Sequence, residues 1–307
     1  MTIEAVTAYI EHLDWLHNPS ISFLACGYGN DNYRIDDGDN TYVCRVKKTT
    51  EFPDSLRNEY TLFLFLENQG YDFCPRAIHL NSEETILIES YITGDELRHE
   101  QFSDAQITQF AEQLYSLENL NISELHNFCT QNNLPQLPIT TPVDSLQKYG
   151  FDRFNTVNPD IVDSEIIEWL QTHLRACYDT VTSTINSEEP HVEWGDVQGS
   201  VLLDQDSNMY FFDFEHAMIG YGTDLSYVKI HSSFSPQQFA TLIKSYTELS
   251  NQSEAEVWRK ITQEEQITRV NDVVWAAMKW SETNDKSFKT LTYERQKLVS
   301  DTLDLPA

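Results

Sequence analysis

A glycine-rich turn between two strand-like segments constrains the fold of this chain most strongly. Residues 21–24 have the composition of a strand, and residues 32–35 alternate apolar and polar side chains, so Gly27-Tyr28-Gly29-Asn30 joins the two strands of a hairpin. A dinucleotide-binding turn must instead open into a helix. The sequence also contains no GxxxxGK[ST] segment. Both Rossmann and Walker-type nucleotide folds are therefore excluded.

The rest of the chain divides into a strand-rich part and a helical part. Apolar residues up to Leu16 predict a first helix that ends before Asn18-Pro19, and residues 54–69 predict a second, closed by Gly70. Strands are predicted at 41–46, 77–80 and 85–91. Beyond residue 95 apolar residues recur three and four apart, as in the long helix expected from about 160 to 184.

This pattern predicts an α+β protein with two lobes, because repeated β-α-β alternation is missing. Residues 1–95 form a small antiparallel β lobe with one main helix, and residues 96–307 form a larger, mostly helical lobe. A cleft between two such lobes is a natural ligand site.

Composition limits the partners of the chain. There are 49 acidic against 20 basic side chains, a net charge of −29 spread along the whole sequence, which disfavours nucleic acids and anionic membrane surfaces. The five cysteines form no CxxC pair, so we expect buried free thiols in a reducing compartment. The amino terminus has no basic region followed by an apolar core, and the longest apolar run, 62–66, is too short to span a bilayer. We therefore expect a cytoplasmic protein.

A second constellation lies at 194–215. Trp194-Gly195-Asp196 and Phe212-Asp213-Phe214 flank a predicted hairpin that brings the two aspartates together. Phosphoryl transfer uses two such carboxylates, one to orient and deprotonate the attacking hydroxyl and one to hold Mg²⁺. Each aspartate alone has the ordinary alternative of a turn residue. Their place after a glycine loop, a strand cation and a helix carboxylate favours the catalytic interpretation.

The strand cation is Arg45, which alternates inward with Val43. A cation on that buried face needs a carboxylate, and Glu59 on the following helix is the candidate. The alternative is an exposed arginine on an edge strand. Lys47, on the same strand face, and Lys48 are rivals for the role.

In this order, from about residue 24 to residue 227, the motifs resemble the aminoglycoside phosphotransferase family, which includes choline-kinase-like and other small-molecule kinases with a protein-kinase-like fold. The resemblance implies a catalytic base, a magnesium ligand and a set of nucleotide-binding residues. The base is Asp196 and the main Mg²⁺ ligand Asp213, with Asp224 in an acidic-leucine pair downstream. The implied nucleotide-binding residues are Gly27, Gly29, Asn30, Arg45, Glu59, and Glu89 and Tyr91 in the hinge whose backbone binds adenine.

Two positions depart from the family pattern. Trp194 replaces the histidine that begins the base motif, and Ser200 stands where the family has an asparagine as second Mg²⁺ ligand. Gln198 offers a chemically equivalent amide oxygen and is the other candidate for that ligand.

The resemblance implies an ATP- and Mg²⁺-dependent phosphotransferase that transfers the γ-phosphate to a hydroxyl of a small molecule, such as an amino sugar, an amino alcohol or a similar metabolite. The alternative, motivated by Trp194 and Ser200, is a nucleotide-binding pseudokinase with a regulatory or scaffolding role. A protein kinase is disfavoured because the sequence has no HRD and no APE segment. We expect a small-molecule hydroxyl acceptor, no nucleic acid and no membrane; the sequence does not specify an oligomeric state.

Overall fold

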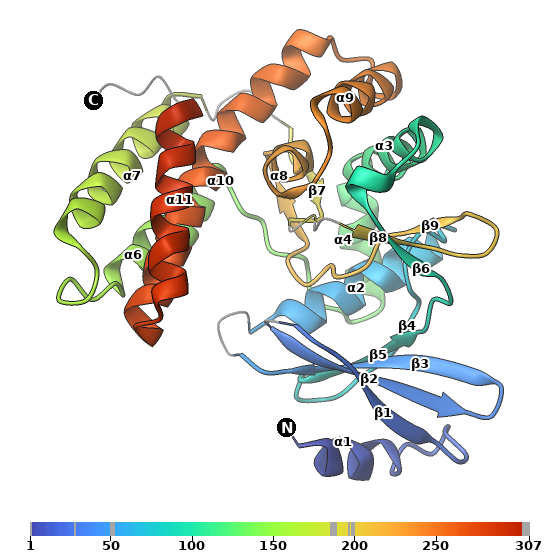
Figure 1. Ribbon diagram of the computed structural model, residues 1–307. Helices are drawn as coiled ribbons and strands as arrows, with labels where there is room; N and C mark the ends of the chain where they lie inside the picture. Colours follow the sequence, from blue (N-terminus) through green and yellow to red (C-terminus); the bar gives the residue numbers. More distant parts are fainter. Residues whose placement is uncertain are drawn as a thin grey trace.

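The small lobe is an antiparallel sheet with a helix on each side (Figure 1). The computed structural model describes residues 2–27, 29–49, 53–184, 189–195, 197 and 200–302. The strands of the sheet follow the order β1-β2-β3-β5-β4. The elements of this lobe are α1 (Ile3–Ile10), β1 (Ser20–Cys26), β2 (Asn30–Asp37), β3 (Asn40–Lys47), α2 (Ser55–Asn68), β4 (Ala77–Leu80) and β5 (Ile86–Ser90).

Strand β3 carries different chemistry on its two faces. Cys44 and Val46 belong to an apolar core that α1 closes. Because successive side chains of a strand alternate, Arg45 faces the opposite side, toward α2. Antiparallel pairing places Val43 opposite Glu89 of β5. Two charged residues, Arg45 and Glu89, therefore share the face that looks toward the larger lobe.

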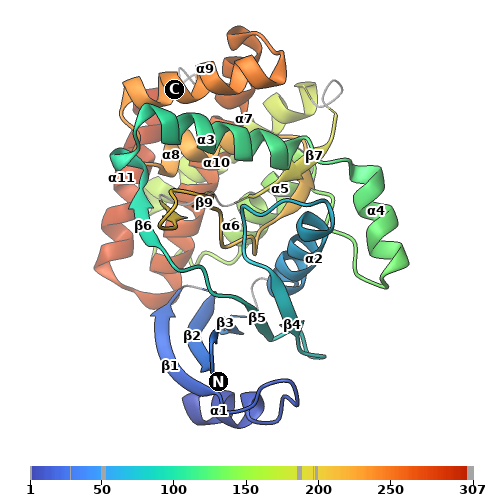
Figure 2. The same ribbon diagram turned by 90° about the vertical axis from the view of Figure 1, so that its right-hand side faces the viewer.

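The larger lobe is mostly helical, with two small sheets near its centre (Figure 2). One sheet has the strand order β6-β8-β9, and the other pairs β10 with β7. The first elements are β6 (Asp95–Arg98), η1 (His99–Gln101), α3 (Asp104–Glu118), α4 (Ile122–Gln131), α5 (Pro142–Ser145), η2 (Leu146–Asp152), α6 (Arg153–Asn155) and α7 (Ser164–Thr184). The remaining elements are β7 (His191–Glu193), β8 (Ser200–Leu203), β9 (Met209–Tyr210), β10 (Met218–Gly220), α8 (Asp224–His231), α9 (Pro236–Ser250), α10 (Glu254–Thr283) and α11 (Lys286–Thr302).

Helix α2 is anchored in the larger lobe although the chain places it in the smaller one. Four of its apolar side chains, from Leu62 to Leu66, belong to the core that α3 and α9 build. Phe63 meets Phe214 edge-on at 5.5 Å, and Phe65 packs against Phe128 of α4. A second core joins α7, α10 and α11. Because α2 also contacts β4 and β5, its position is fixed by both lobes.

The fold class is the predicted one, a small antiparallel lobe and a larger helical lobe, while the predicted division at residue 95 stays a prediction. Two helix boundaries differ. The first helix ends at Ile10 and not near Leu16. The residues from Tyr9 to Leu16 form separate hydrogen-bonded turns, which keep the apolar spacing although they are not one continuous helix. The helix expected from about residue 160 begins at Ser164, after a turn in which Asn158 accepts from Ile161 and Val162.

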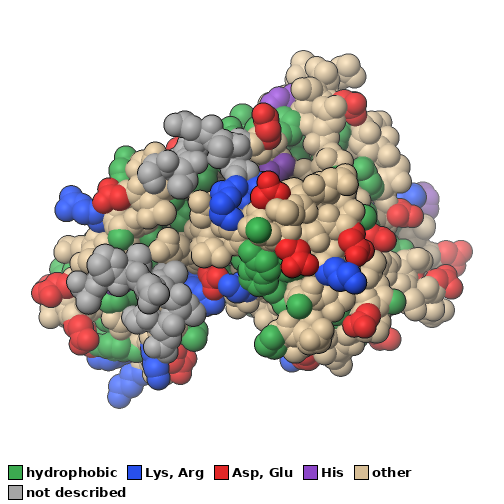
Figure 3. Space-filling model, turned by 90° about the horizontal axis from the view of Figure 1, so that it is seen from above, with side chains coloured by type: hydrophobic (Ala, Val, Ile, Leu, Met, Phe, Trp, Pro, Cys, Tyr) green, Lys and Arg blue, Asp and Glu red, His purple; other side chains and the backbone are tan. Residues whose placement is uncertain are grey.

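The acidic side chains are scattered over the part of the surface that Figure 3 shows. On the face shown in Figure 3, aspartate and glutamate side chains alternate with lysines and arginines and do not gather in one patch. No helix among the described residues is long and apolar enough to cross a membrane. Four cysteines are buried free thiols as expected, but Cys26 is exposed because it ends the outer strand β1.

A buried histidine interrupts the aromatic core of the larger lobe. His99 is fully buried and stacks on Phe234 at 4.8 Å, with Phe102 and Phe110 edge-on at about the same distance. Neither ring nitrogen has a hydrogen-bond partner among the described residues. Burial lowers the pKa of His99 to about 4, against a weaker opposing effect of Glu100. The fold therefore holds this imidazole neutral.

Replacing this histidine is expected to stabilise the protein. His99→Phe keeps the ring contacts and removes two unsatisfied polar atoms, so the free energy of unfolding should rise by about 1–2 kcal/mol at pH 8. Below pH 6.5 the His99 side chain is protonated in the unfolded chain but stays neutral in the folded chain. The free energy of unfolding of the wild type therefore falls as pH drops toward 4. At pH 5 this difference in protonation adds about 2 kcal/mol to the amount by which the free energy of unfolding of His99→Phe exceeds that of the wild type. Urea unfolding of both proteins at pH 8 and pH 5 measures the two differences; equal stabilities at both pH values would contradict the role assigned to His99.

Candidate active site

Arg45 is the centre of a buried ionic cluster between the lobes. Its Nη1 donates to Oε1 of Glu59 at 2.9 Å, and its Nη2 reaches Oδ1 of Asp213 at 2.5 Å and Oε2 of Glu215 at 3.5 Å. Burial alone would lower the pKa of Arg45, but these carboxylates raise it well above its usual value. The guanidinium therefore ties β3, α2 and the segment after β9 together.

The predicted pairing of Arg45 with Glu59 is thus present, and neither lysine takes its place. Lys47 donates to the carbonyl of Pro53, and Lys48 pairs with Asp31 at 3.2 Å. Both lysines are consequently engaged away from Glu59.

The peptide bond between Asp213 and Phe214 is held from both sides. Asp213 has a φ of +66°, a left-handed conformation that a side chain other than glycine adopts only under constraint. Its carbonyl accepts from Nε1 of Trp194 at 2.9 Å, and the N–H of Phe214 donates to Oε1 of Glu59 at 2.8 Å. These two bonds fix the direction in which the Asp213 carboxylate leaves the backbone.

Trp194 has a structural role that its departure from the family pattern did not suggest. Its ring is buried and stacks between Phe211 and Phe214, at 4.5 and 5.0 Å. The indole N–H supplies the donor for Asp213. The replacement of histidine at this position therefore keeps the segment before Asp196 attached to the segment that carries Asp213.

Asp224 holds the same segment from the other side. It is buried and accepts from the backbone N–H of Trp194 at 2.7 Å and of Gly195 at 2.9 Å. Burial, followed by repulsion from Glu193, raises the pKa of Asp224 to about 8. Gly195 has a φ of +84°, and a β-carbon there would lie 2.5 Å from the carbonyl oxygen of His216. This turn therefore requires glycine.

The glycine loop contacts the cluster through Glu215. The amide of Asn30 donates to Oε2 of Glu215, and a β-carbon at Gly29 would lie 3.0 Å from Oε1 of the same carboxylate. The N–H of Gly27 donates to the carbonyl of Asn30 at 2.8 Å and closes the turn. Gly27, Gly29 and Asn30 are thus brought to the edge of the Arg45 cluster.

Four carboxylates surround one guanidinium in this cluster, so it carries a surplus of negative charge. Burial raises the pKa of Glu89 to about 7, and burial together with Asp213 raises that of Glu215. Buried oxygens of Glu59, Glu89 and Asn30 have no hydrogen-bond partner among the described residues. Such a set of oxygen donors fits a hard divalent cation. Asp213, about one-third exposed, is the carboxylate open to the cleft.

No group of three or more Asp, Glu, His or Cys side chains among the described residues is placed so that it could hold a metal ion.

The remaining predicted residues have mixed positions. Asp196 and Gln198 lie outside the described residues, and Ser200 begins β8 with its side chain also outside them. The side chain of Glu89 in β5 interacts with the Arg45 cluster, and the predicted backbone contact of this hinge with adenine stays a prediction. Tyr91 lies under Arg34, 4.8 Å from the ring centre, so its ring contacts a different cation.

A cavity of about 390 Å³ opens beside Gly195. Three carboxylates line it, from Glu193, Glu264 and Asp272, and so do the rings of Tyr149, Tyr221, Tyr227 and Trp275. Asp272 is engaged with His231 at 3.5 Å and Arg295 at 3.8 Å. Burial is the main cause that raises the pKa of Glu193 to about 8 and that of Glu264 to about 7. Besides Gly195, the lining of this cavity comes from residues 140–153, from β7, from the 216–227 region and from helices α8, α10 and α11.

The two-lobed fold and the Arg45 cluster define the class of kinase-like phosphotransferases. Residues 20–260 match the phosphotransferase enzyme family, and since the match spans most of the chain, the protein belongs to this family. A search of the curated proteins gives no match.

Solved structures share the fold at low sequence identity. The gentamicin complex of APH(2")-IIa is 15% identical with a TM-score of 0.71, the match covering 97% of this chain and 96% of the other. An ethanolamine kinase of Plasmodium vivax is 14% identical with a TM-score of 0.68, covering 97% and 85%. The choline kinase LicA of Streptococcus pneumoniae is 14% identical with a TM-score of 0.66, covering 97% of each chain.

Removing the indole donor should destabilise the protein more than removing a surface tryptophan. Trp194→Phe keeps an aromatic ring but leaves the Asp213 carbonyl without its partner, so we expect a loss of about 1–3 kcal/mol in the free energy of unfolding. Trp169→Phe is the matched control, because Trp169 lies only half-buried on α7, stacked on His173. Urea unfolding compares the two variants, and equal losses would contradict the importance of this hydrogen bond.

Proposed function

We propose that the protein transfers the γ-phosphate of ATP, with Mg²⁺, to a hydroxyl group of a small molecule that also carries a protonated amine. The single observation that carries the proposal is that Arg45 binds both Glu59 and Asp213. Trp194 and Asp224 hold the segment before Asp196, and this segment lies beside a cavity of metabolite size. Family membership supports phosphoryl transfer as the chemistry.

The nucleotide phosphates belong at the Arg45 cluster in this proposal. Arg45, held by Glu59, supplies a fixed guanidinium that binds phosphate oxygens. Gly27, Gly29 and Asn30 cover the phosphates, because the loop they form reaches the cluster through Glu215. Glu89 and Tyr91 border the base-binding side. Structures with the same fold include a complex with GDP and one with ADP.

Asp213 is the main Mg²⁺ ligand, with Ser200 and Gln198 as candidates for a second one. A bound Mg²⁺ neutralises the charge that develops on the transferred phosphate. The chain's own contribution is orientation. The bonds to Trp194 and Glu59 hold the Asp213 backbone, and Arg45 offsets part of the carboxylate surplus.

Asp196 is the base that orients the acceptor hydroxyl and accepts its proton. The backbone N–H groups of the two residues before it, Trp194 and Gly195, donate to Asp224, which supports this assignment. The acceptor occupies the cavity next to Gly195. Burial raises the pKa values of both Glu193 and Glu264, and the charge of Glu264 raises that of Glu193 further. A ligand amine would favour the ionised form of both carboxyl groups.

The carboxylates of this cavity favour an amino sugar or an amino alcohol, although Arg153 and Arg295 also line it. Aromatic rings beside carboxylates bind organic ammonium groups through cation–π contacts. Structures with the same fold include a kanamycin complex and kinases of ethanolamine and choline. The alternative of a pseudokinase is not favoured, because Trp194 keeps a hydrogen bond to the Asp213 backbone.

Loss of the base should reduce turnover without loss of nucleotide binding. Asp196→Ala should lower kcat by about 10²–10⁴-fold, the usual contribution of a general base. The measurement is ADP release with a panel of amino sugars and amino alcohols, and thermal shift with ATP and Mg²⁺ reports binding. Asp206→Ala, in the exposed turn between β8 and β9, is the matched control. Turnover by the Asp196 variant at the wild-type rate would refute the assignment.

The charge of the cavity should govern acceptor affinity. Glu264→Gln is expected to raise KM for an aminated acceptor about tenfold or more and to leave KM for a neutral polyol unchanged. Because the pKa of Glu264 is about 7, its carboxylate is ionised above that pH, so the wild-type KM should fall from pH 6 to pH 8. The variant should show a shallower dependence.

Glu282→Gln, an exposed position on the same helix α10, serves as the control for this experiment. Equal KM values for Glu264→Gln and Glu282→Gln at pH 8 would exclude Glu264 from acceptor binding.

A further inference from the structure

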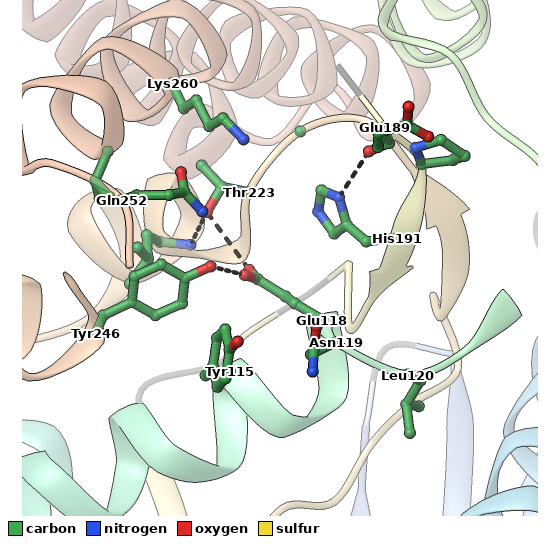
Figure 4. A pocket seen from close by; sticks show the side chains of 14 residues that line it. Tyr115, Glu118, Asn119, Leu120, Glu189, His191, Thr223, Tyr246, Gln252 and Lys260 are labelled. Atoms are coloured by element: carbon green, nitrogen blue, oxygen red, sulfur yellow. Dashed lines mark hydrogen bonds between the residues drawn. The ribbon is translucent and has the colours of Figure 1, made fainter. Parts of the chain in front are cut away.

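A second cavity, of about 310 Å³, lies between α3, β7, α9 and α10. Figure 4 shows its side chains converging from these elements on a common space. Among the described residues, it shares Gly222 alone with the acceptor cavity. Its volume is within the range of small-ligand sites, and nothing in the proposed phosphotransfer uses it.

Glu118 is the polar anchor of this cavity. Glu118 is more than nine-tenths buried at the end of α3. Its carboxylate accepts hydrogen bonds from the hydroxyls of Tyr246 and Thr223 (Figure 4). Two hydroxyl donors leave part of the hydrogen-bonding capacity of a carboxylate unused. In the part of the chain that the structure describes, no ion pair joins Glu118 to a lysine or an arginine.

The surroundings of Glu118 favour a cationic ligand. Asp224 lies close enough for the two carboxyl groups to repel one another, and Glu193 adds to this field. The rings of Tyr115 and Tyr246 meet edge-on at 5.9 Å beside Glu118, and aromatic faces attract ammonium groups. Other walls of the cavity are lined by His191 and by Lys260, which has a partner of its own. We therefore expect the amine of a ligand to lie at the end of the cavity next to Glu118.

The cavity is joined directly to the turn that precedes the proposed base. Thr223, which bonds to Glu118, is the N-cap of α8 and accepts from the N–H of Leu225. The next residue, Asp224, holds the N–H groups of Trp194 and Gly195. A ligand that orders Thr223 therefore also orders the support of this turn.

We propose that this cavity is a second ligand site for a small organic cation bearing a protonated amine, and that its occupation stabilises the contact between Asp224 and the turn at Trp194–Gly195. The site is distinct from the acceptor cavity, and its test requires no phosphotransfer.

The probe is n-butylammonium chloride, which has no hydroxyl group to phosphorylate. Isothermal titration calorimetry at constant ionic strength should show saturable binding to the full-length protein, and 1-butanol should show none. Glu118→Gln should weaken binding at least tenfold. Asn119→Trp should weaken it similarly, because it adds bulk at the exposed rim and leaves the Glu118–Tyr246 contact in place. Glu264→Gln alters the acceptor cavity and should preserve the component of binding that Glu118→Gln weakens, because an ammonium bound in the acceptor cavity forms a separate component.

Hydrogen exchange of the segment 191–195 tests the connection. We expect slower exchange at Trp194 and Gly195 when n-butylammonium is bound to the wild type, and no change in Glu118→Gln. Binding that survives in Glu118→Gln and Asn119→Trp but is lost in Glu264→Gln would overturn the proposal, since the amine would then occupy the acceptor cavity. Absence of saturable binding would overturn it as well. Saturable binding with unchanged exchange would overturn the connection to the turn.

Discussion

The peptide bond between Asp213 and Phe214 is the constraint on which the rest of the site depends. Its carbonyl is bonded to Trp194 and its N–H to Glu59, so a residue with an unfavourable backbone conformation is held in a single orientation. Each partner also has a second function. Trp194 carries the turn that Asp224 supports, and Glu59 holds Arg45. The glycine loop, the strand cation and the turn before Asp196 therefore have defined positions relative to one peptide unit.

This arrangement concentrates negative charge where a bound divalent cation would bring positive charge. A buried ion pair contributes little net stability, because desolvation offsets the attraction. We therefore attribute the surplus of carboxylates around Arg45 to ligand binding and not to the stability of the fold. Buried carboxylates also line the cavity beside Gly195, where burial is the main cause that raises the pKa values of Glu193 and Glu264. The ligands that complete these clusters should lower those pKa values toward the usual range.

Much of the frame could be predicted from the sequence, because its signals are local. The glycine hairpin follows from turn chemistry and strand alternation, and the pairing of Arg45 with Glu59 follows from a buried strand face and the next helix. The role of Trp194 could not be predicted, since its partner, Asp213, is 19 positions away and the bond depends on how two aromatic rings stack. The side-chain position of Glu89 likewise depends on strand register. Cavities are formed by several elements at once and leave no periodic pattern.

Helix α2 contacts both lobes. Its apolar side is embedded in the core of the helical lobe, and it also contacts β4 and β5 of the sheet, while Glu59 binds Arg45. The same guanidinium binds Asp213, which follows β9 in the larger lobe. A movement that separates the sheet from the segment after β9 would therefore have to break the contact between Arg45 and Asp213, a charged contact within a buried cluster.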